Sequence, residues 1–258
     1  SPFGWPERGS LLALERVVSP VLDFGFSLKA EFDPARTVAL TQQAEAAGFG
    51  SGWLWDNHVL WRDVYPTLTL MAAATTTMRL GACVTNPTTR DPSISAAALA
   101  TLAEVSGGRI DLGMGRGDGP VRMLGLPPTK LKTMEHAVLV IRELAEGRTV
   151  EHKGSELQLD CAGQWKLPVW VAGYGPMALA MTGRVADGLI LQLGDPELIR
   201  WMAGQMQAAA TEAGRDPDSI LIQAAAPAHV GPIEDCRERV RWFPAMVANH
   251  VVDLVNKY

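Results

Sequence analysis

The sequence lacks the features that mark several classes of protein. No run approaches the ~20 consecutive apolar residues of a membrane-spanning helix, which argues against an integral membrane protein. Lysine and arginine total 23 against 28 aspartates and glutamates, so the net charge of −5 leaves no basic excess to neutralise nucleic-acid phosphates. Ser1–Pro20 has no long apolar segment followed by a cleavage site. We therefore expect a cytoplasmic protein in which residues 1–20 form an extension outside the fold.

Cysteine is also scarce, and the few cysteines form no pattern. Their number is odd and their spacing is not that of metal ligands: Cys83, Cys161 and Cys236. Separate reduced thiols are the expected state in a cytosolic protein. Three histidines likewise lack partners at metal-ligand spacing: His136, His152 and His229. We therefore predict no bound metal.

Apolar residues, in contrast, are plentiful enough for a sizeable core. The chain has 258 residues, of which 47% are hydrophobic, and its mean hydropathy is +0.06. This length suits one large α/β domain or two small ones. Strand and helix patterns alternate at roughly the thirty-residue period of βα units, which favours one domain over residues 21–258.

The stretch 79–119 shows this pattern most clearly. Arg79–Val84 and Ile110–Met114 are apolar runs typical of buried parallel strands. Between them, Asp91-Pro92 predicts a helix start and Gly107-Gly108 a helix end. Each strand runs into a loop of small and polar residues at its carboxyl end, where parallel α/β folds bind ligands. Either loop alone is compatible with a plain turn, but two on neighbouring strands favour a site.

The remaining elements continue the alternation until one interruption. Further strands are expected at 21–28, 52–55, 168–172, 188–192 and 219–226, and further helices at 34–47, from Pro66, at 129–146, 176–186 and 196–213, and from Glu234 towards Tyr258 with a break at Pro244. Residues 149–159 alternate around Lys153-Gly154 and predict a hairpin within an insertion at about 120–165. Seven strands result, and an eighth, which would close a barrel, is missing from the sequence.

Four segments taken in order resemble one known family. They are GACVTNPTTRDP, SGGRIDLGMGRGD, LPVWVAGYGPMALAMTGRVADG and VRWFPAMVANH. They resemble the luciferase-like superfamily of flavin and deazaflavin enzymes. Within it they are similar to the coenzyme F420-dependent oxidoreductases related to methylenetetrahydromethanopterin reductase.

This resemblance implies a fold and an oligomeric state. The implied architecture is a (β/α)8 TIM barrel with the insertion after strand four over its mouth, here without the C-terminal eighth strand. Family members commonly pair through early helices, which correspond to Asp33–Ala47 and Pro66–Thr77. An open barrel also exposes sheet edges that proteins normally cover. We therefore expect a homodimer or a larger homo-oligomer.

The turn between the fifth strand and the next helix is the candidate phosphate site. It contains Gly173, Tyr174, Gly175, Pro176 and Met177. Glycines let the backbone approach an anion, and the free amides of a helix N-terminus hold it. A plain strand–helix turn is the alternative from the residues alone. The resemblance implies that the cofactor phosphate binds here.

The end of the second strand carries candidate acid–base groups. His58 matches the histidine of many deazaflavin relatives, and a histidine can donate or accept a proton near neutral pH. Asn57 occupies the position of the family's acidic residue, so proton transfer would rest on His58 or Asp56. A structural histidine in a polar network is the alternative. Trp61 is a candidate wall of the pocket or a core residue.

The third and fourth strands contribute further candidates. The resemblance places Thr85 and Asn86 beneath the tricyclic ring and implies a non-prolyl cis peptide in the third strand. Asp118 falls where some relatives have an acidic proton donor, and Arg116 is a partner either for a cofactor anion or for Asp118. The implied cofactor-binding set also contains Asn57, Gly115 and Gln192.

These observations support three hypotheses about function. The first is an oxidoreductase that transfers a hydride between coenzyme F420 and a small organic substrate. The second is a monooxygenase that uses reduced FMN and oxygen at the same site. The third, of another class, is a non-catalytic flavin-binding or assembly subunit. Both enzymes need the same phosphate turn, so the sequence does not separate them.

Overall fold

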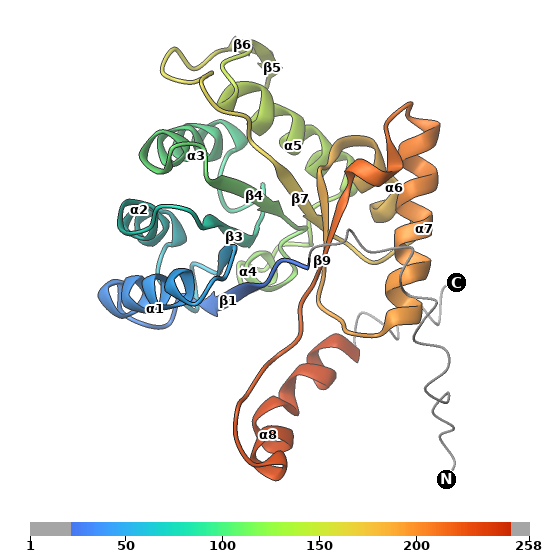
Figure 1. The fold of residues 1–258 in the computed structure, drawn as a ribbon. Helices are drawn as coiled ribbons and strands as arrows, with labels where there is room; N and C mark the ends of the chain where they lie inside the picture. Colours follow the sequence, from blue (N-terminus) through green and yellow to red (C-terminus); the bar gives the residue numbers. More distant parts are fainter. Residues whose placement is uncertain (1–21, 249–258) are drawn as a thin grey trace.

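The centre of the structure, a computed structural model that describes residues 22–248, is a sheet of seven parallel strands (Figure 1). The strands lie in the order β1 (Gly25–Lys29), β2 (Ser51–Trp55), β3 (Arg79–Thr85), β4 (Ile110–Met114), β7 (Val169–Ala172), β8 (Gly188–Leu191) and β9 (Leu221–Ala224). The sheet curls into an open half-barrel whose two edges, within the described residues, are β1 and β9. This arrangement confirms the α/β fold class and the seven strands expected from the sequence.

Helices follow the strands, and most of them cover the outside of the sheet, whereas α8 lies away from it (Figure 1). They are α1 (Pro34–Ala46), α2 (Val64–Ala74), α3 (Pro92–Ser106), α4 (Asp118–Met123), α5 (Leu131–Ala145), α6 (Pro176–Val185), α7 (Pro196–Glu212) and α8 (Ile233–Val240), with a 3-10 turn at Pro217–Ser219 and helical residues at 242–248. The prediction that α2 starts at Pro66 is wrong, because the Asp63 side chain caps Tyr65 N at 3.0 Å and starts the helix two residues earlier.

The helix signals near α3 are confirmed in detail. Asp91 accepts a hydrogen bond from Ser93 N at 2.9 Å, and Pro92 is the first helical residue. Gly107, with φ of 67°, ends the helix in the left-handed conformation that glycine tolerates. The predicted break near Pro244 lies at Arg241, and Pro244 falls in the first turn of the helical residues that follow. The segments expected at 1–20 and beyond residue 248 lie outside the described residues.

Two boundaries differ from the sequence-based expectation because local geometry intervenes. The strand expected at 21–28 forms only from Gly25, where its pairing with β2 begins at Ser51. Residues 118–123, for which the sequence predicted no helix, form the short helix α4. Gly117 precedes α4 in the left-handed conformation, and Asp118 provides a favourable negative charge in its first turn.

The insertion after β4 carries the predicted hairpin, which consists of β5 (Val150–His152) and β6 (Ser155–Leu157). The turn residues Lys153 and Gly154 both have positive φ, as a tight hairpin requires. Asp91, the cap of α3, also contacts this hairpin: its carboxylate lies 2.6 Å from Lys153 Nζ and 3.2 Å from His152 Nε2. One side chain therefore joins the insertion to the body of the barrel.

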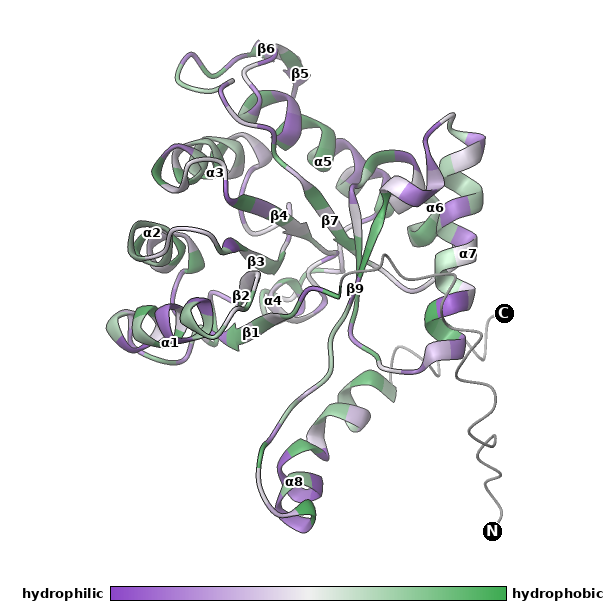
Figure 2. Cartoon of the chain, in the orientation of Figure 1, coloured by the Kyte–Doolittle hydropathy of each residue, from purple (hydrophilic) through white to green (hydrophobic). Residues whose placement is uncertain are grey.

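Buried apolar residues of the strands and helices pack together and form the core. In the hydropathy colouring most of β7 is hydrophobic (Figure 2). The largest cluster joins β2, β3 and β4 to α2, α3 and α5. A second cluster joins β8 to α6 and α7, and Val247 packs into it. No helix of residues 22–248 is long and apolar enough to cross a membrane.

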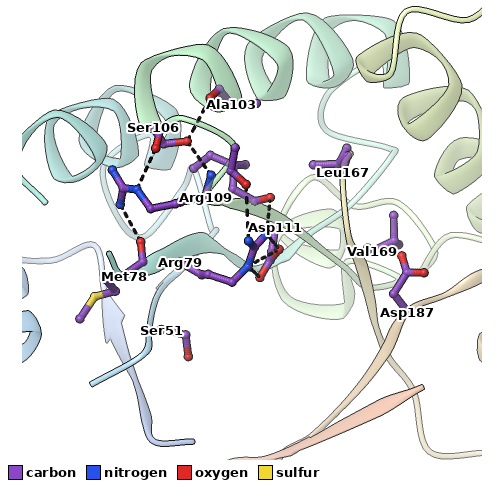
Figure 3. A network of polar contacts seen from close by, with 12 residues as sticks. Ser51, Met78, Arg79, Ala103, Ser106, Arg109, Asp111, Leu167, Val169 and Asp187 are labelled. Carbon is purple, nitrogen blue, oxygen red and sulfur yellow. Dashed lines mark hydrogen bonds and ion pairs between the residues drawn. The ribbon is translucent and has the colours of Figure 1, made fainter. Parts of the chain in front are cut away.

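The amino ends of the central strands are closed by buried polar contacts (Figure 3). Arg79 at the start of β3 pairs with the Asp111 carboxylate of β4. Arg109 donates to four backbone carbonyls, at distances from 2.7 to 3.0 Å: Ala72, Thr75, Met78 and Ser106. Glu45 Oε1 accepts three amides of the loop that enters β3: Thr76, Thr77 and Met78. This end of the sheet has few unsatisfied groups and serves stability.

Candidate functional site

A pocket of about 1150 Å³ lies at the opposite, carboxyl ends of the strands. Its lining comes from the ends of β2, β3, β4, β7 and β8, together with the first turns of α4 and α6. Ten of the predicted site residues line it: Asp56, Asn57, Gly115, Arg116, Asp118, Gly173, Tyr174, Gly175, Met177 and Gln192. The ends of parallel strands therefore bring together residues that are far apart in the sequence.

The turn between β7 and α6 presents an open helix N-terminus to the pocket. Gly175 is the N-cap, and no side chain hydrogen-bonds to the amides of the first turn. A Cβ at Gly175 would meet no atom within 4 Å, whereas a Cβ at Gly173 would lie 2.7 Å from Ala178 Cβ. Pro176 is the first helical residue and does not line the pocket. This arrangement suits an anion, which the exposed amides and the helix dipole would hold.

Tyr174 ties this turn to the end of β8. Its hydroxyl accepts a hydrogen bond from Gln192 N at 3.0 Å. Burial raises the pKa of the Tyr174 phenol to about 12, so it stays protonated at neutral pH. Two residues predicted separately as cofactor ligands thus contact each other and fix one side of the pocket.

Asp56 supplies the half-buried carboxyl of the pocket. Burial raises its pKa above the ordinary value, and Asp63 adds to the rise. The Thr85 hydroxyl, the Arg90 guanidinium and His58 act in the opposite direction. A buried carboxyl with a raised pKa in a pocket is a candidate acid–base group.

Asn57 and His58 belong to the same loop as Asp56, but their side chains have different surroundings. Asn57 Oδ1 accepts amide hydrogen bonds from Val59 at 3.1 Å and Leu60 at 3.3 Å, which shape the loop beneath the pocket. The His58 side chain is exposed and is not among the residues that line the pocket. The catalytic role predicted for His58 stays a prediction, and its position gives it no contact with the cavity.

Thr85 and Asn86 lie behind the pocket wall and do not line it. Asn86 Oδ1 accepts the amides of Thr88 and Thr89 and so holds the loop after β3. The residues of β3 that do face the cavity are Cys83 and Val84. The peptide bond between these two residues is cis, as the resemblance implied for the third strand.

The loop after β4 packs closely against β3. A Cβ at Gly115 would lie 2.5 Å from Val84 Cγ2, so only glycine fits there. Arg116 Nε donates to the Thr129 carbonyl at 2.7 Å, and no ion pair joins Arg116 to Asp118. Asp118 instead lies 3.8 Å from Arg122 on the exposed side of α4. Arg116 and Asp118 both line the pocket.

Apolar residues form one wall of the pocket, and the sequence indicated only some of them. Trp61, a candidate wall residue from the sequence, lines the pocket together with Trp55, and their ring centroids are 5.8 Å apart. Trp242 lies 6.4 Å from Trp55, and Met246 reaches the pocket from the same helical segment. Only the folded chain brings this C-terminal segment to the ends of β1 and β2. Within residues 22–248 there is no cluster of three potential metal ligands.

The sequence matches a known protein family. The profile described as luciferase-like monooxygenase matches residues 17–254. The 5,10-methylenetetrahydromethanopterin reductase of Archaeoglobus fulgidus is 36% identical over 160 residues, which are 60% of this chain and 48% of the reductase. The chain spans about half the length of the curated relatives that it matches.

Solved structures share the fold. The coenzyme F420-dependent tetrahydromethanopterin reductase of Methanopyrus kandleri superposes with a TM-score of 0.71 and 29% identity, covering 79% of this chain and 65% of the reductase. The oxygenating constituent of a Pseudomonas putida Baeyer–Villiger monooxygenase, in complex with FMN, superposes with a TM-score of 0.71 and 15% identity, covering 91% of this chain and 78% of that protein. At 15% identity the likeness concerns the fold alone.

Proposed function

The chain belongs to the luciferase-like monooxygenase family, and on this premise we propose that it is an oxidoreductase that transfers a hydride between coenzyme F420 and a small organic substrate. The reductases that it resembles at 29% identity or more support this cofactor over FMN. The observation that carries the proposal is the open N-terminus of α6 at the pocket, opposite apolar strand ends.

The residues present fit a cofactor with a phosphate and a planar ring. The turn Gly173–Met177 offers amides without a side chain that blocks them, and the space beside Gly175 is free. Val84, Ile190 and Trp55 provide apolar surface for a ring. A bound deazaflavin supplies the hydride acceptor or donor. The chain would bind the phosphate at α6, orient the ring against β3 and exclude water from it.

We assign the proton-handling role to Asp56 in this proposal. It lines the pocket, and burial raises its pKa towards the working range of an acid–base group. Asp118 is the second candidate, because it also lines the pocket but lies in a more solvated position. The carboxyl of Asp56 would take up or release the proton that balances hydride transfer at the substrate.

The phosphate assignment is tested by placing a carboxylate at the turn. Gly175→Asp should weaken F420 binding by about 10–100-fold, because like charges repel and the first-turn amides are then occupied. Fluorescence titration of F420 measures this affinity. Gly204→Asp is the matched control, since it adds the same charge on the exposed side of α7, where a Cβ meets no atom within 4 Å. Unchanged affinity in a folded Gly175→Asp protein would refute the assignment.

The FMN-dependent monooxygenase is the second candidate, supported by the FMN complex that shares the fold. A parallel titration with FMN separates the two, because the proposal requires tighter binding of F420. Tight FMN binding with oxygen-dependent turnover would favour the monooxygenase. Binding of neither coenzyme would favour a non-catalytic subunit.

We also propose that the protein forms a homodimer or a larger homo-oligomer. Large apolar side chains stand exposed on the helices that the resemblance assigns to pairing and on their neighbour: Leu70 on α2 is 49% exposed and Ile94 on α3 is 56% exposed. Covering such side chains is a common reason for association. Light scattering at micromolar concentration tests the proposal, and a monodisperse monomer would contradict it.

A further inference from the structure

The backbone around Arg116, in the loop after β4, is held closely against β3 and the loop that follows it. Arg116 stands between two glycines that leave no room for a larger residue. A Cβ at Gly115 would lie 2.5 Å from Val84 Cγ2. A Cβ at Gly117 would lie 2.8 Å from Asn86 Cγ, and Gly117 also has a φ of 78°, in the left-handed region that favours glycine. The position of the Arg116 backbone is therefore fixed from both sides.

The Arg116 side chain is anchored at its inner end. Its Nε donates to the Thr129 carbonyl at 2.7 Å, and Thr129 N donates in return to the Arg116 carbonyl at 3.0 Å. Thr129 is buried, and its hydroxyl lies 2.7 Å from that of Thr88 in the loop after β3. A buried residue thus holds the guanidinium in one orientation before any ligand binds.

The outer end of the guanidinium has no partner in the described part of the chain. Within residues 22–248, no hydrogen bond or ion pair reaches Arg116 Nη1 or Nη2. Asp118, which follows two residues later, lies instead 3.8 Å from Arg122. The other acidic residue that lines the pocket is Asp56, just after β2. Arg116 also lines the pocket, so its fork of N–H donors is available to a ligand there.

The pocket therefore contains two separate sets of donors for anions. The first is the open N-terminus of α6, to which the proposed function assigns the coenzyme phosphate. The second is Arg116, whose loop continues into α4. This helix touches the loop of Asp56, because Asn57 Nδ2 donates to Met123 Sδ at 3.7 Å. A group bound by Arg116 would thus lie on the side of the pocket that carries the candidate proton-handling carboxyl.

We propose that Arg116 is a substrate-binding residue whose Nη groups hold a carboxylate, so that the substrate of this protein is a small organic acid. A planar guanidinium can donate to both oxygens of a carboxylate, and fixing Nε in advance reduces the entropy lost when this pair forms. A second anionic group of the coenzyme is the other source of the same chemistry, and the experiment separates the two. The inference rests on the proposed function for the reaction, but its test measures binding alone.

Benzoate and benzamide are suitable probes, because they have nearly the same shape and only benzoate is charged. Their aromatic ring suits the wall formed by Trp55 and Trp61. Each probe is titrated into the 15N-labelled 258-residue chain, with and without F420, and NMR shifts of the backbone amides give the dissociation constants. We expect benzoate to bind about tenfold more tightly than benzamide, since a charge-assisted pair forms only with the acid. Arg116→Met should abolish this preference and leave benzamide affinity unchanged.

Matched variants separate this effect from a general change of charge. Arg200→Met removes the same charge from an exposed position on α7, outside the pocket lining, and should keep the full preference for benzoate. Arg116→Lys keeps the charge but lacks the planar fork and the Nε anchor, so its preference should fall to about threefold. Circular dichroism verifies that each variant is folded, and Arg116→Gln provides the same test if Arg116→Met folds poorly.

The outcomes distinguish the inference from the proposed function. Equal binding of the two probes to the wild type, or a preference that survives in folded Arg116→Met, would overturn the inference. A preference lost in Gly175→Asp but kept in Arg116→Met would also overturn it, because the carboxylate would then bind at α6. Loss of F420 affinity in Arg116→Met, with benzoate binding unchanged, would assign the arginine to the coenzyme instead. Conversely, a preference that depends on Arg116 in a protein that does not bind F420 would support the inference and refute the proposed cofactor.

Discussion

The two ends of the central sheet use similar side chains for opposite purposes. At the amino ends, Arg109 donates to four carbonyls, Glu45 accepts three amides, and Arg79 pairs with Asp111. At the carboxyl ends, the N-terminus of α6 has no side-chain cap and the hydroxyls of Thr85 and Tyr65 lack partners. The same strands β2, β3 and β4 connect the two ends.

The difference shows where this fold can tolerate unsatisfied polar groups. The closed end anchors the loops that enter the strands, so the open end can keep free amides and a half-buried carboxyl without losing the fold. Changes at the closed end should therefore alter stability with little effect on binding. Changes at the open end should alter binding and turnover with little effect on stability. Four substitutions test this division.

The largest effect is expected at the open end, at Asp56. Asp56→Asn should lower turnover in hydride transfer by about 10²–10⁴-fold, because the amide can neither hold nor release the proton. F420 affinity should change by less than about threefold, because the proposed phosphate site at α6 would carry most of that binding. The rate of change of the F420 absorbance band measures turnover, with Asp118→Asn as the comparison. Native turnover in Asp56→Asn, with a loss in Asp118→Asn, would move the role to Asp118.

The next effect is expected at the closed end, at Arg109. Arg109→Met keeps much of the apolar stem but removes every donor, so four carbonyls lose a partner. We expect the free energy of unfolding to fall by about 2–4 kcal/mol. Urea denaturation measures it, and F420 affinity should stay near that of the wild type. A variant as stable as the wild type, or a folded variant that has lost F420 affinity, would contradict the view that the amino ends serve stability and the carboxyl ends serve binding.

A smaller effect is expected from Glu45, and it depends on pH. Burial alone would raise its pKa, but hydrogen bonds from Thr77, Met78 and Thr76 lower the pKa from 4.5 to about 2. A folded-state pKa below the unfolded one contributes stability above about pH 4.5, and this is lost as pH falls towards 2.

Glu45→Gln should therefore reduce stability by about 1–2 kcal/mol at pH 7, after allowance for solvent screening, and by much less near pH 2. Chemical denaturation of both proteins across this range gives the difference curve. The difference is needed because Asp91 also has a lowered pKa and weakens the fold in acid. A difference that does not depend on pH would show that the carboxylate charge of Glu45 contributes nothing.

The smallest effect is expected at His58, although the sequence made it a catalytic candidate beside Asp56. Its side chain is exposed and outside the pocket lining, so His58→Ala should change turnover by no more than about threefold. A modest shift of the pH profile is expected, since His58 acts on the pKa of Asp56. A loss of turnover comparable to that of Asp56→Asn would restore the sequence-based assignment.

Much of the fold follows from local signals. The Asp-Pro pairs before α1 and α3, the Gly107 end of α3 and the Lys153-Gly154 turn each act over a few residues, so the sequence was sufficient to predict them. The predicted start of α2 was wrong because two helix-start signals, Asp63 and Pro66, lie close together. The helix begins after the Asp63 cap and not at Pro66.

The site was only partly predictable, because its geometry depends on long-range packing. Residues at strand ends were identified as a group, since the carboxyl ends of parallel strands converge. The sequence could not show that Asp56 faces the pocket while His58 faces solvent, because both belong to one loop whose path is set by Asn57. Nor could the sequence place Trp242 beside Trp55, because most of the chain separates these two residues.

The double use of Asp91 has a consequence for how the molecule opens. The same carboxylate caps α3 and contacts both His152 and Lys153 of the hairpin. If the hairpin detaches, the cap loses two partners, and if the first turn of α3 frays, the hairpin loses its anchor. Local unfolding of either segment therefore removes contacts that stabilise the other. We expect the hairpin and the start of α3 to unfold together, as one cooperative unit. Amide exchange in β5 and in the first turn of α3 should then be governed by a common opening event.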